Sequence, residues 1–141
     1  MLNKTRVKER ILLISNFYNE LQKLATLSKD DFFSDSRNYA AAESYLRRSL
    51  EAIFDIGRHI LAKTGQVEMS LEYKAIAQGL KDNKIISSNL GEHLIKMAGY
   101  RNRLVHLYHQ VSKEELYKII CDDLSDFKNF ILEIDEYLQE D

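Results

Sequence analysis

Proline is absent from all 141 residues of the chain, and only five residues are glycine. Proline breaks the interior of a helix and glycine weakens it, whereas strands joined by tight hairpins usually need glycine in their turns. No Asn-Gly or Asp-Gly pair occurs, and no segment alternates apolar and polar residues over many positions. The sequence therefore predicts an all-α protein.

Apolar residues repeat at intervals of three and four along most of the chain, a spacing that places them on one face of a helix. This spacing predicts four long helices and one short one, at about these positions: 4–25, 36–63, 71–82 (the short one), 89–106 and 112 onward. Such helices pack as an antiparallel bundle. We therefore predict one domain over residues 1–141, a four-helix bundle with one short additional helix.

Local signals support several of these helix ends. Gly65 is expected to end the second helix, and Ser87 or Ser88 to cap the fourth. Ser112 and Glu115 have the spacing of a capping box and are expected to open the last helix. The polar segment 26–35 is expected to be a loop.

Composition excludes several classes of protein. With 45% hydrophobic residues, the chain is too apolar to be disordered. No apolar run approaches the roughly 18 residues that a membrane span needs, and no segment has the pattern of a signal peptide. The single cysteine, Cys121, excludes an intrachain disulfide framework and a cysteine-rich zinc site. We therefore expect a cytoplasmic protein with no membrane association.

The net charge of −2 conceals a strong asymmetry along the chain. Residues 1–26 carry a net charge of +3, residues 27–85 are neutral, residues 86–111 carry +2 and residues 112–141 carry −7. The third of these segments also contains three of the four histidines: His93, His106 and His109. A pI near 6 is therefore compatible with a local basic face that binds anions.

One segment, residues 100–109, gathers polar and aromatic side chains at the end of a predicted helix. It reads Tyr-Arg-Asn-Arg-Leu-Val-His-Leu-Tyr-His. In the simplest interpretation, its cations only complement the negative end of the helix dipole. In the functional interpretation, histidine exchanges a proton near neutral pH and arginine binds phosphate oxygens, while asparagine orients a neighbouring group. Together they suit metal-free cleavage of RNA, in which the 2′-hydroxyl attacks the adjacent phosphorus; DNA lacks this nucleophile.

The spacing of these residues limits how they converge. At about 100° per residue, Asn102 and His106 share one edge of a helix, whereas Arg101 and His106 point about 140° apart. Either the helix ends or distorts near His106, or a two-fold axis brings two copies of the segment together. We favour the dimer, because two copies also build a wider basic groove.

Other kinds of chemical site find little support. His106 and His109 have the spacing of metal ligands, but no acidic residue lies between Glu92 and Glu114. The sequence contains no glycine-rich phosphate loop and no nucleophile elbow. We therefore predict neither a metal site nor a cofactor.

At this segment the sequence resembles the HEPN superfamily and, within it, the HepT-like toxins of toxin–antitoxin pairs. The motif R-x4-H-x-Y of that family corresponds to Arg101, His106 and Tyr108, and Asn102 occupies a position that is polar in these ribonucleases. The likeness extends over about residues 5–135 and includes these segments: 51–61, 73–76, 79–80, 85–86 and 94–98.

The resemblance implies a metal-independent endoribonuclease toxin of a type VII-like toxin–antitoxin pair, acting as a homodimer with a shared cleft. Arg101 and His106 would be the catalytic pair, with Asn102 and Arg103 supporting RNA binding. The partner would be a minimal nucleotidyltransferase antitoxin of the MntA type, which transfers AMP from ATP to Tyr108. The residues beside this tyrosine depart from the family, which often has an acidic residue where Leu107 stands and a bulky aromatic one at His109.

Two alternatives belong to other functional classes. The same fold serves as a non-catalytic helper subunit of minimal nucleotidyltransferases, although a helper need not keep both Arg101 and His106. A histidine-phosphotransfer bundle is also helical with an exposed histidine. That class has a lysine and small residues after its histidine, which the sequence Leu-Tyr-His at 107–109 does not match.

Overall fold

The computed structural model describes residues 2–65, 72–106 and 111–140. Within these ranges the chain is helical and contains no strand, as the sequence predicts. The helices, in order, are α1 (Lys4–Ala25), α2 (Lys29–Ser34), α3 (Ser36–Lys63), α4 (Tyr73–Asp82), α5 (Ser88–Val105), α6 (Lys113–Asp122) and α7 (Ser125–Glu140).

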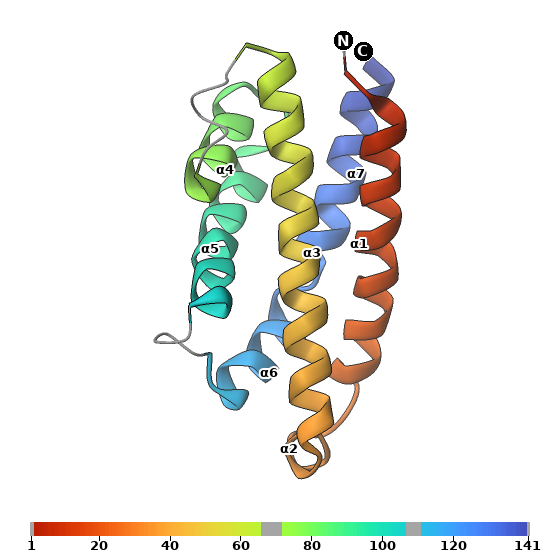
Figure 1. The fold of residues 1–141 in the computed structure, drawn as a ribbon, viewed down its shortest axis with the longest axis vertical. Coiled ribbons are helices and arrows are strands. Elements are labelled where there is room, and N and C mark those ends of the chain that lie inside the picture. Colours follow the sequence, from red (N-terminus) through yellow and green to blue (C-terminus); the bar gives the residue numbers. More distant parts are fainter. Residues whose placement is uncertain (1, 66–71, 107–110, 141) are drawn as a thin grey trace.

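The long helices alternate in direction and form the predicted antiparallel bundle. In Figure 1, α3 runs through the middle of the molecule, with α1 and α7 on one side and α4 and α5 on the other. The short helix α4 packs on both α3 and α5. The start of α1 and the end of α7 lie near each other at the top of the view.

Several helix ends follow the local signals in the sequence. The hydroxyl of Ser87 accepts a hydrogen bond from the amide of Leu90 and caps α5. The hydroxyl of Ser112 accepts from the amide of Glu115 and caps α6. After α3 ends, Gly65 adopts a positive φ of 88°, a conformation that glycine reaches without steric strain.

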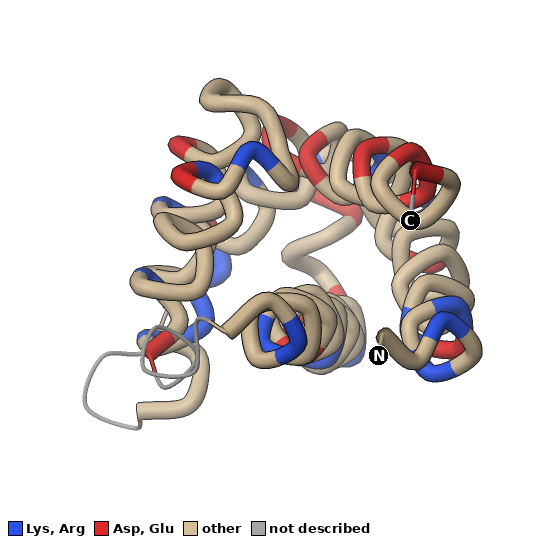
Figure 2. The backbone as a smooth tube through the Cα atoms, turned by 90° about the horizontal axis from the view of Figure 1, so that it is seen from above, with Lys and Arg blue, Asp and Glu red and all other residues tan. Residues whose placement is uncertain are grey.

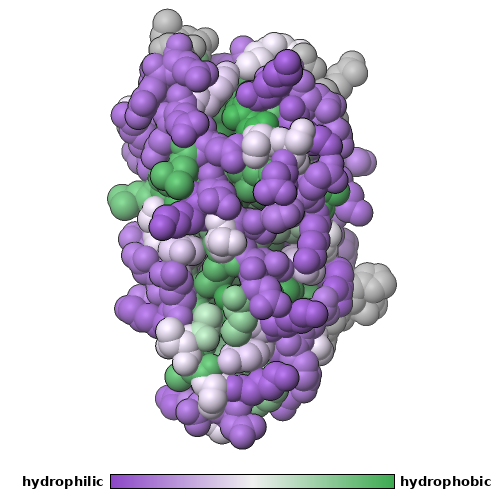
Figure 3. Space-filling model, turned by 180° about the vertical axis from the view of Figure 1, so that it is seen from behind, coloured by the Kyte–Doolittle hydropathy of each residue, from purple (hydrophilic) through white to green (hydrophobic). Residues whose placement is uncertain are grey.

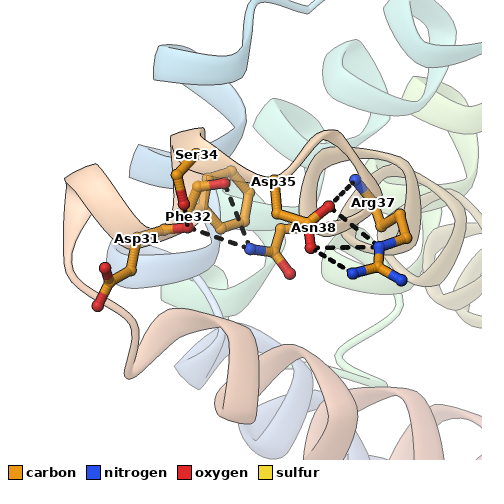
Figure 4. A network of polar contacts seen from close by, with 6 residues as sticks. All are labelled: Asp31, Phe32, Ser34, Asp35, Arg37 and Asn38. Atoms are coloured by element: carbon orange, nitrogen blue, oxygen red, sulfur yellow. Dashed lines mark hydrogen bonds and ion pairs between the residues drawn. The ribbon is translucent and has the colours of Figure 1, made fainter.

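The segment 26–35, expected to be a loop, contains the short helix α2. Ser28 caps this helix, and Phe32 on its inner side is buried. Figure 4 shows how α2 turns into α3: the carboxylate of Asp35 accepts from the backbone and side chain of Arg37, while the Asn38 amide donates to the carbonyls of Asp31 and Phe32. Helix-capping bonds and one buried aromatic ring therefore order a segment with no long apolar repeat.

The predicted last helix is divided into α6 and α7. The chain bends at Asp123 and Leu124, and Leu124 is only 7% exposed. The bend leaves the apolar repeat in step, so that Leu116, Phe127 and Ile134 are all buried. The apolar spacing therefore gave no sign of a break, and neither glycine nor proline marks it.

The core consists of the apolar faces that the three-four spacing predicts, although some residues of these faces are only half-buried. On α1 the spacing favours burial of Tyr18, but Tyr18 is half-buried and its neighbour Phe17 is buried. Helix α4 packs closely on α3 at Gly57, where a Cβ atom would lie 2.6 Å from Cγ2 of Ile76. Because Gly57 has no side chain, α4 can lie directly against α3, with Tyr73 at its start.

The surface is largely polar, but its charges are unevenly distributed. Seen from above, acidic positions gather along the helix that ends at the C-terminus (Figure 2). The face turned away in Figure 1 is mostly hydrophilic, with apolar groups in small areas between polar ones (Figure 3). Among the described helices, none is both long enough and apolar enough to cross a membrane.

Candidate active site

Three of the predicted site residues line one surface pocket. Arg101 and Asn102 come from the C-terminal part of α5, and His106 follows the end of the helix. The pocket has a volume of about 530 Å³, and its other lining residues come from α3 and the start of α4: Arg58, Glu72, Tyr73 and Lys74. A polar and mainly cationic pocket of this size suits an anionic ligand.

The end of α5 explains how Arg101 and His106 reach the same pocket. The helix stops at Val105, and His106 has φ −98° and ψ 116°, an extended conformation. A continuing helix would have turned the His106 side chain away from Arg101. Of the two arrangements predicted from the spacing, the end of the helix is present, and it brings both residues together within one chain. The homodimer stays a prediction.

The guanidinium of Arg101 is held against an aromatic ring. Its central carbon lies 4.2 Å from the ring centroid of Tyr73, and Arg58 lies 5.6 Å from the same centroid. On α3, Phe54 stacks on Tyr73 with a centroid distance of 5.0 Å and an interplanar angle of 15°. The stack therefore connects Arg101 to the rigid centre of the bundle, because Phe54 is fully buried.

The Nε atom of Arg101 is buried and has no hydrogen-bond partner among the described residues. A buried donor without an acceptor costs about 1–3 kcal/mol relative to a satisfied one. This unsatisfied N–H is on the residue that the sequence assigns to phosphate binding. A ligand oxygen that reached it would recover part of that cost.

Arg103 lies elsewhere and forms a structural ion pair. Its guanidinium donates two hydrogen bonds to the carboxylate of Glu115, at 2.5 and 2.6 Å, and so connects α5 with α6. Hydrogen bonding between them lowers the pKa of Glu115 and raises that of Arg103. The structure therefore does not bring Arg103 together with the other predicted substrate-binding residues.

The remaining predicted residues of the segment, Leu107, Tyr108 and His109, lie outside the described residues. The chain that follows them is attached to the bundle, because the hydroxyl of Tyr39 donates to the carbonyl of Val111 at 2.6 Å. His93, the other histidine near this segment in sequence, pairs with Asp126 through its Nδ1 at 2.7 Å and does not line the pocket.

Four pocket residues were missed by the sequence reasoning: Arg58, Glu72, Tyr73 and Lys74. Tyr73 lies in step with the apolar residues of its helix, a pattern that favours a place in the core, and nothing in the local sequence connects α4 with the segment 100–109. Glu72 also supplies the carboxylate that is absent around His106 in sequence. Over the part of the chain that the structure describes, no three His, Cys, Asp or Glu side chains lie close enough together to hold a metal ion.

The sequence matches one protein family, described as "Ribonuclease HepT-like", over residues 14–134. A protein of Aphanizomenon flos-aquae named "tRNA nuclease HepT" is 26% identical over 132 residues, which span 94% of this chain and 89% of that protein. A protein of Shewanella oneidensis named "mRNA nuclease HepT" is 31% identical over 86 residues, which span 61% of this chain and 64% of that protein.

Solved structures share the fold at lower identity. A Shewanella oneidensis HEPN toxin, described as tri-AMPylated and in complex with an MNT antitoxin, superposes with a TM-score of 0.81 and 24% identity, over 93% of this chain and 97% of that one. The Bacillus subtilis cytosolic protein YutE, described as of unknown function, has a TM-score of 0.76 and 20% identity, over 99% and 92% of the two chains.

Proposed function

The chain belongs to the ribonuclease HepT-like family, and from this premise we propose that it is a metal-independent endoribonuclease toxin that cleaves RNA with Arg101 and His106. The observation that carries the proposal is the pocket that Arg101, Asn102 and His106 line together. The relatives named as tRNA and mRNA nucleases support RNA as the class of substrate.

The chemistry follows from these three side chains. His106 accepts the proton of the ribose 2′-hydroxyl, whose oxygen then forms a bond with the adjacent phosphorus. The bond from phosphorus to the 5′-oxygen breaks, that oxygen takes up a proton from water, and a 2′,3′-cyclic phosphate remains; His106 then releases its proton to the solvent. Arg101 neutralises the charge on the non-bridging oxygens, a task for which its permanent charge needs no metal ion. Asn102 orients the hydroxyl or the imidazole by hydrogen bonding.

Cleavage by the purified chain tests this mechanism. We expect RNA to be cut in the presence of a chelator, leaving a cyclic phosphate or a 3′-phosphate. His106→Ala should abolish cleavage while the helical circular dichroism stays unchanged. Activity that disappears with the chelator, or that survives in His106→Ala, would contradict the mechanism. A folded chain that binds RNA or a nucleotidyltransferase but never cleaves RNA would instead be the non-catalytic helper subunit.

Regulation by a nucleotidyltransferase is the second part of the proposal. The AMPylated toxin–antitoxin complex among the structural neighbours supports an MntA-like partner that transfers AMP from ATP to Tyr108. The phosphodiester anion of the added AMP would then pair with Arg101 and compete with the RNA phosphate. We also propose that the toxin works in the cytoplasm as a homodimer, in which two copies of the basic pocket would form a wider groove for RNA.

Modification of Tyr108 has a direct test. Incubation with the partner and ATP should add AMP to Tyr108, as located by peptide mass spectrometry. The Tyr108→Phe variant should remain toxic and escape neutralisation by the partner. If the partner still silences this variant by modifying another residue, the assignment to Tyr108 is wrong.

A further inference from the structure

Building on the proposed function, we propose that single-stranded RNA extends from the active-site pocket into a second groove between α1 and α3, where arginines held on aromatic rings bind its phosphates. This arginine groove has a volume of about 380 Å³, and Arg58 and Tyr73 line both it and the active-site pocket. The two depressions are therefore neighbours on the surface, with Arg58 and Tyr73 at their common boundary. The groove is lined by these residues: Arg10, Leu13, Phe17, Arg48, Glu51, Ala52, Asp55, Arg58 and Tyr73.

Guanidinium groups packed on rings follow this path. Arg48 lies 4.6 Å from the ring centroid of Phe17, while Arg58 and Arg101 lie 5.6 and 4.2 Å from that of Tyr73. A ring that covers the face of a guanidinium restricts a long side chain and leaves the N–H groups at its edge able to donate. Arginines fixed in this way bind phosphate oxygens with less loss of conformational freedom than mobile ones.

The spacing along α3 sets the length of RNA that the groove accommodates. Arg48, Glu51, Asp55 and Arg58 follow one another at intervals of three and four, so they share one face of the helix. Ten residues separate Arg48 from Arg58, which corresponds to about 15 Å along the axis. At about 3.4 Å for each stacked nucleotide, this distance spans roughly four nucleotides. A dinucleotide in the active-site pocket would therefore not reach Arg48.

Both carboxylates in the groove are paired with arginines, of which Arg10 belongs to the lining and Arg6 and Arg47 lie outside it. Asp55 forms ion pairs with Arg6 and Arg10 at 3.4 and 2.9 Å, and Glu51 pairs with Arg47 at 3.1 Å. The linings of the groove and the active-site pocket together contain five Lys or Arg and three Asp or Glu. By contrast, a pocket between α5 and α6 contains three Lys and four Asp or Glu. The arginine groove and the active-site pocket therefore carry an excess of positive charge, which the pocket between α5 and α6 lacks.

A second copy of the chain is the competing occupant. Leu13 in the groove is 40% exposed, and its neighbour Leu12 is 63% exposed, which is compatible with a protein contact. However, a two-fold interface centred on the groove would bring the same arginines against one another, and like charges across an interface are unfavourable. RNA phosphates complement the net positive charge of the two linings, and so the observations favour RNA.

Binding measurements on two lengths of RNA test the proposal. In the His106→Ala background, which removes cleavage, fluorescence anisotropy compares a dinucleotide with a single-stranded RNA of about twelve nucleotides, within the range of known single-strand sites. Arg48→Gln should weaken binding of the longer RNA roughly tenfold, as expected for one charge-assisted contact, and lower its salt slope by about 0.7. Its affinity for the dinucleotide should not change.

Arg37→Gln is the matched control, because it removes the same charge from an arginine whose side chain is 90% exposed, at the start of α3 and outside the groove. It should change neither affinity by more than about twofold. Thermal melting of each variant checks that the bundle is folded. Equal weakening by Arg37→Gln and Arg48→Gln would overturn the proposal, because it would indicate unspecific attraction to the net charge.

The remaining outcomes separate this proposal from the proposed function. If the parent chain cleaves RNA and Arg48→Gln changes neither the affinity for the longer RNA nor its KM, the groove is not an RNA site although the nuclease is. If the parent never cleaves RNA and the length-dependent effect of Arg48→Gln persists, the groove stands and the nuclease fails. If Arg48→Gln abolishes self-association in sedimentation and leaves RNA binding intact, the groove is an interface between copies.

Discussion

The C-terminal part of α5 presents two arginines, two positions apart, to opposite kinds of environment. On one side, Arg101 lies on the ring of Tyr73 in an open pocket, and its buried Nε has no hydrogen-bond partner among the described residues. On the other side, Arg103 is engaged by the carboxylate of Glu115 through two short hydrogen bonds. The positive charge of Arg103 is thus balanced within the fold, whereas that of Arg101 is available to a ligand.

This contrast shows why residue type alone is a poor guide to function in such a segment. Both arginines match the chemistry of phosphate binding, and both are half-buried. The partner distinguishes them, because a bidentate carboxylate competes with phosphate for the same N–H groups, whereas an aromatic ring covers only the face of the guanidinium. We therefore expect function to depend on the pocket side of α5, and stability on the side that faces α6.

Replacing each of the two arginines with glutamine should give the largest difference in activity between the two sides of α5. Arg101→Gln should lower kcat/KM for RNA cleavage by about 10²–10³, the usual cost of losing one charge-stabilising donor, with little change in melting temperature. Arg103→Gln should leave kcat/KM within about twofold, because its loss is structural. Initial rates on one RNA substrate, with melting curves of both variants, provide the measurement. Similar losses of activity in both variants would contradict the assignment of Arg101 to cleavage and of Arg103 to stability.

The ring beneath Arg101 gives the next largest effect. Tyr73→Leu should lower kcat roughly tenfold, because a cation–π contact of about 0.5–2 kcal/mol no longer holds the guanidinium in place. Tyr73→Phe keeps the ring and should restore kcat to within about twofold of the parent. Single-turnover rates separate this positioning effect from RNA affinity. If Tyr73→Phe is as defective as Tyr73→Leu, the site depends on the hydroxyl of Tyr73 rather than on its ring.

The sequence was sufficient to predict the fold class and part of the site. The three-four spacing located the long helices, because burial of one helix face imposes that period, and the serine caps fixed the starts of α5 and α6. It did not predict the bend at Leu124, where the apolar period continues, or the helix around Phe32, which is too short to show one. Glu72 and Tyr73 were missed because packing of α4, not sequence proximity, brings them to Arg101.

The ion pair between Arg103 and Glu115, on the side of α5 that faces α6, should make a small but measurable contribution to stability. Glu115→Gln should lower the free energy of unfolding by about 0.5–1 kcal/mol, since the paired side chains are 40% and 34% exposed and solvent screens their attraction. Urea denaturation at neutral pH measures the difference. Lys118→Gln, which alters an exposed residue on the same helix, is the control and should change stability by less than about 0.5 kcal/mol. A loss above about 2 kcal/mol would mean that the pair behaves as a buried one.

The smallest expected effect is the pH dependence of the stability difference between the parent and Glu115→Gln. The direction of the pKa shift of Glu115 fixes the sign of this dependence. Hydrogen bonding to Arg103 lowers the pKa of Glu115 in the folded chain, so the folded state binds a proton at this site less readily than the unfolded state does. The stabilisation is therefore complete above the unfolded pKa of about 4.3 and is lost as the pH falls through the lower folded value. The parent and Glu115→Gln should accordingly differ in stability at pH 7 and converge on acidification below about pH 4. Denaturation curves of the two proteins across this range measure the difference directly, because the other carboxylates titrate alike in both. A gap that persists at low pH would show that Glu115 stabilises the bundle by packing rather than through its charge.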